Sequence, residues 1–96
     1  MIAAANSLQR MLDINGHLRH LVYTLFSRPH ALNPACTGYD LEIVLTDCLS
    51  GREERCLLPD ITTDAARAEA YLQLFADGLV TPVTARDVME DLLGSL

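Results

Sequence analysis

The sequence predicts an α+β domain: an antiparallel meander of three or four strands, followed by two helices packed on one face. Apolar and polar residues alternate from Tyr39 to Thr46, as in a strand that is buried on one side. Two turn signals, Asn15-Gly16 and Ser50-Gly51, divide the part of the chain before Pro59. Beyond Pro59 the apolar residues recur at helical spacing. The chain of 96 residues has the size of a single domain, 1–96.

The first two strands are expected at about 7–14 and 17–27, joined by a tight turn at Asn15-Gly16. The second of them is rich in aromatic and β-branched residues, which favour strands. The segment before the turn also admits a short helix, because Ala3-Ala4-Ala5 is followed by apolar residues at positions 8, 11 and 12. We prefer the hairpin for residues 1–14.

The next two strands are expected at about 39–48 and 52–58, with Ser50-Gly51 as the two central turn residues. That turn would place Cys56 opposite Leu45 and Cys48 opposite Glu53. Cys56 would then point into the core and Cys48 away from it, so a disulfide between them is not expected.

The segment between residues 27 and 38 contains two prolines, Pro29 and Pro34, and shows no apolar period. Proline cannot donate to a β ladder, so an exposed loop is expected here. Within it, the 29–37 loop is the candidate site for a small ligand.

The two helices are expected at about 63–77 and 82–93. Thr62 or Thr63 would cap the first helix, and Gly78 would follow its end as the left-handed residue. Thr81 would cap the second helix, with Pro82 as its first residue.

The net charge of −6 is concentrated at the end of the chain, where residues 60–96 carry two Arg against seven Asp and Glu, a balance of −5. Such a surface repels phosphate, so nucleic acid and anionic membranes are not expected partners. Three cysteines make an odd number, which fits a reducing compartment. No apolar run approaches the roughly 20 residues of a membrane span, and we expect a soluble cytoplasmic protein.

Catalytic and metal-binding arrangements are weak in this sequence. His30 and Cys36 share a loop, but a nucleophile and its base also need a third, orienting group. His17 and His20 lie on opposite faces of one strand and cannot jointly hold a metal. The final two helices resemble a helix–turn–helix, but the second carries one Arg against three acids. We expect a protein that is not an enzyme and needs no cofactor.

Two surfaces are candidates for binding another protein. Asp87, Glu90 and Asp91 gather on the last helix, where Glu90 and Asp91 oppose the helix dipole. A solvated charged face is the simpler interpretation, and docking of a basic partner is the functional one. The second sheet face is expected to be apolar enough for a homodimer; its residues are Leu18, Val22, Phe26, Val44 and Leu57. Partial cover of this face by the N-terminal segment or the 29–37 loop is the alternative.

Four segments together resemble a group of small uncharacterised clostridial proteins that are classed as a domain of unknown function. They are Tyr39-Asp40-Leu41-Glu42-Ile43, Asp60-Ile61-Thr62, Leu79 to Pro82, and Asp87-Val88-Met89-Glu90-Asp91-Leu92-Leu93. The likeness covers about residues 17–93. Members of that group usually have Gly at the position of Asp40. The resemblance implies no activity, cofactor or catalytic residue.

We therefore expect a protein-interaction or regulatory module, with self-association as one mode of action. The alternative is a small-ligand-binding domain that uses the 29–37 loop.

Overall fold

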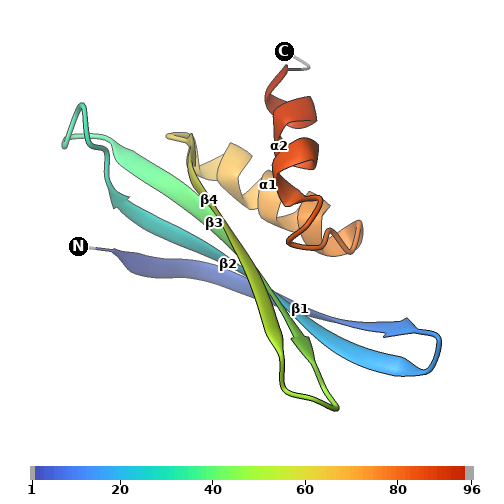
Figure 1. The fold of residues 1–96 in the computed structure, drawn as a ribbon. Helices are drawn as coiled ribbons and strands as arrows, with labels where there is room; N and C mark the ends of the chain where they lie inside the picture. Colours follow the sequence, from blue (N-terminus) through green and yellow to red (C-terminus); the bar gives the residue numbers. More distant parts are fainter. Residues whose placement is uncertain (1, 95–96) are drawn as a thin grey trace.

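The computed structural model describes residues 2–94 and shows the expected α+β architecture. Four strands, β1 (Ala3–Ile14), β2 (His17–Pro29), β3 (Thr37–Asp47) and β4 (Glu53–Thr62), form one antiparallel sheet in the order β1-β2-β3-β4. Two helices, α1 (Ala65–Asp77) and α2 (Ala85–Gly94), follow and pack against one side of that sheet (Figure 1). The fold class predicted from the sequence is confirmed.

The hairpin between β1 and β2 is the one that Asn15-Gly16 predicts. Asn15 and Gly16 both have positive φ, 53° and 82°, and the closing pair is Ile14 with His17. Positive φ at both central residues is the mark of the type I′ turn that Asn-Gly favours. β1 begins at Ala3, earlier than expected, so the helical alternative for residues 1–14 is excluded for the described part of that segment.

The turn between β3 and β4 differs from the expected one. Ile43, and not Leu45, lies opposite Cys56, so the pairing is shifted by two residues. The Asp47 carboxylate accepts hydrogen bonds from the N–H groups of Leu49 and Ser50, which builds a longer loop than Ser50-Gly51 alone would. A shift by two preserves the faces, so Cys56 is buried as expected, and Cys48 lies exposed in the loop.

The segment between β2 and β3 is shorter than the expected loop. The ladder continues past residue 27 to a pair between Pro29 and Thr37, which leaves residues 30–36 as the loop. Pro29 is tolerated because it occupies the last position of its strand.

The helix ends also differ from the sequence prediction. Asp64 caps α1, because its side chain accepts from the N–H of Arg67. Leu79, with φ 53°, takes the left-handed position expected for Gly78. The bonds from Leu79 N to Ala76 O and from Val80 N to Phe75 O complete a Schellman motif one residue later. α2 begins at Ala85, preceded by a turn in which Thr84 N donates to Thr81 O.

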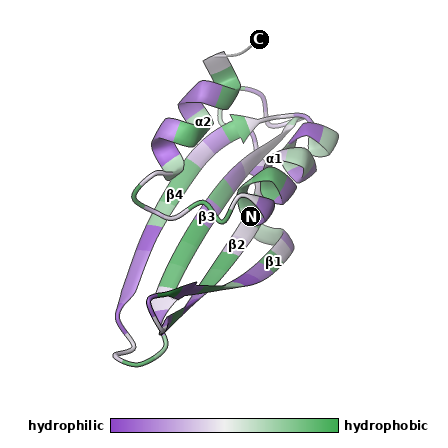
Figure 2. Cartoon of the chain, turned by 90° about the vertical axis from the view of Figure 1, so that its right-hand side faces the viewer, coloured by the Kyte–Doolittle hydropathy of each residue, from purple (hydrophilic) through white to green (hydrophobic). Residues whose placement is uncertain are grey.

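The core is a single apolar layer between the sheet and α1. Alternate residues of the two central strands are almost fully buried, and α1 supplies the opposing stripe of Ala68, Leu72 and Phe75. α1 contacts all four strands, whereas α2 packs beside β4 through Ala85 and Met89. Figure 2 shows the hydrophobic residues concentrated along β2 and β3, while the part of β4 nearest its loop with β3 is hydrophilic.

Tyr23 places a polar hydroxyl in the middle of this layer. Its side chain is fully buried, and its hydroxyl donates to the carbonyl of Val80 at 2.8 Å. This bond ties the centre of the sheet to the connection between the helices. Burial raises the pKa of Tyr23 from 10.0 to about 12, partly offset by the nearby Arg10.

The raised pKa of Tyr23 predicts loss of stability in alkali. The unfolded chain releases the phenolic proton near pH 10 and the native state holds it to about pH 12. The contribution is therefore complete below pH 10 and falls by about 2–3 kcal/mol as the pH rises to 12. Urea unfolding at pH 9 to 12 measures this decline. Tyr23→Phe should flatten it, and an unchanged decline in that variant would assign it to other groups.

Candidate functional site

The side of the sheet that faces away from the helices is open in the described chain. Leu21, Tyr23 and Leu25 point toward the helices, so the even-numbered residues of β2 point the other way. Cross-strand partners share a face, which extends this open face across all four strands. We call it the open face.

The five residues expected to form a dimer face all lie on the open face. Val22 and Val44 are direct cross-strand partners near its centre, and together with Phe26 they are half-buried. Leu57 pairs with Glu42 and is 46% exposed. Leu18 is 50% exposed and is separated from Val22 by His20. The structure thus brings Val22 and Val44 together at the centre and spreads the other three around them. Phe26 lies toward the 30–36 loop, Leu57 on the edge strand β4, and Leu18 toward the Asn15-Gly16 turn.

The open face of β1 and β2 forms an uncharged half. Between Asp13, which lies at the turn, and Arg28, which lies at the loop, this surface has no Asp, Glu, Arg or Lys. We call this surface the uncharged half; it consists of Ala4, Ser7, Gln9, Met11, Leu18, His20, Val22, Thr24 and Phe26. Its polar members bond to each other, with His20 Nε2 3.0 Å from Gln9 Oε1 and Ser7 Oγ 3.4 Å from Thr24 Oγ1.

Charges on the open face are concentrated on β3 and β4. Arg55 lies 2.7 Å from Glu53 and 3.8 Å from Glu42, and these exposed pairs hold its pKa above the usual value. Side-chain bonding to Glu53 is the larger cause. Arg55 thus offsets one of the two negative charges, and the group of three keeps one.

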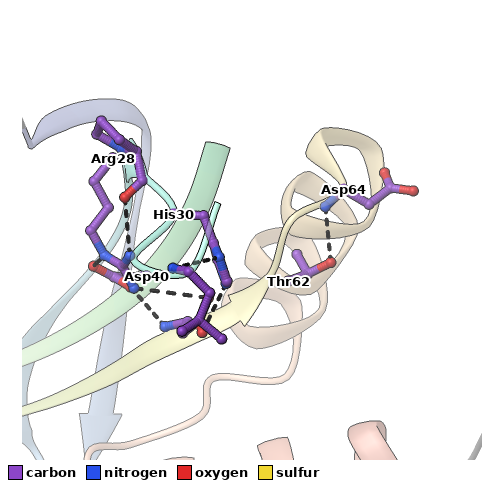
Figure 3. A network of polar contacts seen from close by, with 8 residues as sticks. Arg28, His30, Asp40, Thr62 and Asp64 are labelled. Atoms are coloured by element: carbon purple, nitrogen blue, oxygen red, sulfur yellow. Dashed lines mark hydrogen bonds and ion pairs between the residues drawn. The ribbon is translucent and has the colours of Figure 1, made fainter. Parts of the chain in front are cut away.

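A polar network closes the end of the sheet near the 30–36 loop, and it was not predicted from the sequence. Asp40 is 7% exposed and its carboxylate accepts from Arg28 Nε at 3.1 Å and Nη2 at 3.0 Å (Figure 3). Two parallel bonds of this kind are the strongest arrangement for Arg and a carboxylate. The bond to Asp40 is the main cause of the raised pKa of Arg28.

The same carboxylate stabilises an irregularity in β4. Between the pairs Leu41–Leu58 and Tyr39–Thr62, β4 has three residues where β3 has one, so β4 bulges. Asp60, at the centre of the bulge, has φ 54°, and its N–H donates to Asp40 Oδ1 at 2.7 Å. The buried acid therefore satisfies a main-chain donor that the ladder leaves without a partner.

Asp60 in turn holds the start of the 30–36 loop. Its carboxylate lies 3.4 Å from His30 Nε2 and 3.9 Å from Arg28 Nη2. Gly38 gives the guanidinium room, because a Cβ at this position would lie 3.1 Å from Arg28 Nη1. The network thus joins the ends of β2, β3 and β4 to the loop.

The 30–36 loop is bonded to itself. His30 N donates to Cys36 O and Cys36 N to Asn33 O, both at 2.9 Å. His30 Nδ1 accepts from Leu32 N and Cys36 Sγ from Asn33 Nδ2. The two residues are thus joined through their main chains, while the side chains of His30 and Cys36 bond to different neighbours. Beside the loop is a shallow hollow of about 230 Å³ with both polar and apolar walls; it is lined by Ala3, Ser27, Arg28, Pro29, Pro34, Cys36 and Thr37.

The three acids of the expected docking patch are exposed on α2, but they do not all face the same neighbour. Glu90 faces β4 and lines a groove with Arg86, one helical turn before it. Asp87 and Asp91 do not line that groove. Asp87 lies in the first turn of α2, where the helix dipole favours an anion.

These features define a small α+β domain with one sheet face covered by helices, the other open, and a polar network at one end of the sheet. The chain belongs to a family of unknown function (DUF6514), which it matches over residues 5–95. The family resemblance expected from the sequence is confirmed at that level, and the match also covers most of β1. No curated protein and no solved structure matches the chain.

The structure also bears on metals and membranes. Within residues 2–94, no three His, Cys, Asp or Glu side chains are grouped so as to hold a metal ion. Neither described helix has the length and apolarity to cross a bilayer.

The network around Asp40 predicts that a conservative substitution of this residue lowers the free energy of unfolding substantially. Asp40→Asn removes the charge that Arg28 binds and weakens the acceptor of Asp60 N–H, so we expect a loss on the order of 2 kcal/mol in urea unfolding. Glu42→Gln is the matched control, because Glu42 is the next acid on the same face of β3 and its Arg55 partner is exposed. The control should lose less than about 0.5 kcal/mol. Equal losses in the two variants would contradict the structural role assigned to Asp40.

Proposed function

We propose that this protein is an interaction module, working by binding and not by catalysis, and that it self-associates through its open face. The observation that supports this most strongly is the uncharged half of that face. Protein interfaces are depleted of charge at their centres and place polar groups at their rims. The open face has this arrangement, with the charged pairs of β3 and β4 on one side of the uncharged half.

The size of the face is adequate for such a contact. The molecule measures 47 × 30 × 17 Å, and the sheet forms one of its broad sides. A specific interface needs about 800 Å² from each partner, so a contact of that size would use the whole open face, β3 and β4 included. A two-fold arrangement would let the same surface serve both copies.

The edges of the sheet favour stacking of two open faces over extension of the sheet. At the β1 edge, Ser7 N–H donates to Asn6 Oδ1, and Arg10 Nη1 donates to the Gln9 carbonyl. Two main-chain groups of this edge strand are thus occupied within the chain. At the other edge, β4 carries Pro59 and the bulge at Asp60. Both devices discourage edge pairing.

The acidic balance of the chain supports a protein partner over a nucleic acid. A net charge of −6 opposes phosphate contacts, which supply most of the affinity of nucleic-acid binders. A reducing, cytoplasmic setting is part of the same proposal, supported by three cysteines that are all free.

Self-association predicts a particle of twice the 10.6 kDa chain mass in sedimentation equilibrium. Leu18→Lys combined with Thr24→Lys puts two positive charges on each copy of the uncharged half, so like charges would meet in the dimer. We expect the dimer dissociation constant to rise at least tenfold.

The matched control is Leu32→Lys combined with Leu49→Lys, which makes the same charge change at side chains 91% and 87% exposed in two loops. The control should remain dimeric, and circular dichroism should show both variants folded. A wild-type protein that stays monomeric at millimolar concentration would refute self-association.

A second candidate function is small-ligand binding beside the 30–36 loop, the site that the sequence suggested at 29–37. The hollow of about 230 Å³ supports it, as does the self-bonded loop, which offers a formed site. The hollow is smaller than the roughly 300–1,000 Å³ typical of ligand pockets, so we rank this function second.

A fragment screen by ¹H–¹⁵N NMR tests the second candidate. Ligands that bind here should shift the amide signals of Cys36 and Thr37. Pro34→Gly should lower the affinity for these ligands several-fold, because it loosens the loop. Shifts confined to the open face would instead assign the ligands to the uncharged half.

A further inference from the structure

A groove lies on the helix side of the molecule, between the end of β4 and one side of α2. This groove has a volume of about 150 Å³, and its walls are Leu58 to Ile61 from the strand and Arg86, Met89, Glu90 and Leu93 from the helix. It is too small for the usual small-molecule pocket of about 300–1,000 Å³. It suits a single large side chain presented by another chain.

The floor of the groove is apolar. Leu58, Ile61 and Met89 are 5%, 6% and 4% exposed, so they are buried by the fold and form a fixed surface. Leu93, one helical turn after Met89, is 41% exposed at the mouth. An apolar side chain that enters the groove would cover Leu93 and contact Met89 at the same time.

The surroundings of the groove are acidic. Asp60 and Glu90 stand on its rim together with Arg86, and α2 carries two further acids, Asp87 and Asp91, outside the groove. Arg28 and His30 approach Asp60 from the other side, so Asp60 is the more neutralised of the two rim acids. The resulting negative potential favours a partner whose apolar side chain is flanked by Lys or Arg.

The β4 side of the groove determines how a partner segment would bind. Pro59 has no N–H to give to an added strand, and the bulge at Asp60 interrupts the regular edge. Main-chain pairing along β4 is therefore disfavoured here, and recognition depends on side chains, as in helix-in-groove binding.

We propose that the groove between β4 and α2 binds an apolar side chain of a basic segment from a partner protein. This surface is on the opposite side of the sheet from the open face, so the two binding roles are independent.

Selection of phage-displayed random 12-residue peptides against the purified protein tests the proposal. The enriched peptides should share one large apolar residue flanked by Lys or Arg. A synthetic peptide with the enriched sequence should shift the methyl signals of Met89 and Leu93 in ¹H–¹³C NMR. Its affinity should fall at least fivefold between 50 and 300 mM salt, and by a similar factor in the double variant Glu90→Gln with Asp91→Asn.

Leu93→Lys, which places a cation at the mouth of the groove, should abolish peptide binding. Leu74→Lys is the matched control, because Leu74 is 54% exposed on α1 and does not line the groove; it should bind as the wild type does. An absence of enriched peptides, a consensus without basic residues, or shifts at Val22 and Val44 instead of Met89 would each overturn the proposal.

The occupant is also tested directly. If Leu93→Lys converted a dimeric protein to a monomer, a second copy would be the occupant and the basic-segment proposal would be wrong. Failure of the groove proposal with an intact dimer would leave self-association through the open face unaffected.

Discussion

One-sided burial of the two central strands under α1 is the constraint on which the rest of the molecule depends. One layer of strand side chains forms the sheet side of the core. α1 contacts every strand, whereas α2 packs beside β4. Because α1 covers only one face, the other face of the sheet has no layer of its own in the described chain. The open face and the groove along α2 both follow from having two helices in unequal contact with one sheet.

The polar end of the sheet shows how a local irregularity is stabilised. A bulge in β4 would leave the Asp60 N–H without a ladder partner, and the carboxylate of Asp40 supplies one. Asp40 is itself acceptable in a buried position because Arg28 pairs with it through two bonds, and Gly38 leaves space for the guanidinium. A residue that appears in the sequence as an ordinary solvent-facing acid of a strand is thus part of the framework that fixes the 30–36 loop.

The elements that sequence reasoning recovered are those set by neighbouring residues. Asn15-Gly16 determines the first hairpin, and alternation from Tyr39 identifies both the strand and its buried side. The errors arise where side-chain hydrogen bonds at turns, or pairings across a loop, decide the geometry. The Asp47 carboxylate lengthened the β3–β4 turn and moved the register by two, which no alternation pattern could reveal because the faces stay the same. The Arg28–Asp40 pair depends on the register between β2 and β3. That register could not be predicted, because the segment between these strands has no apolar period. The groove requires the position of α2, set by a turn at Thr81–Thr84 that shortened the helix.

The protection of the β1 edge has a consequence for how the chain reaches its native state. Asn6 and Arg10, which occupy main-chain groups of that edge, are themselves held by α1, through Glu69 at 2.9 Å and Asp77 at 3.3 Å. α1 follows all four strands in the chain, so during synthesis the hairpins emerge before the helix that restrains these two side chains. Until α1 docks, the newly synthesised sheet has an unprotected edge strand at β1 and an exposed apolar face. During this interval, association between unfinished chains competes most strongly with folding.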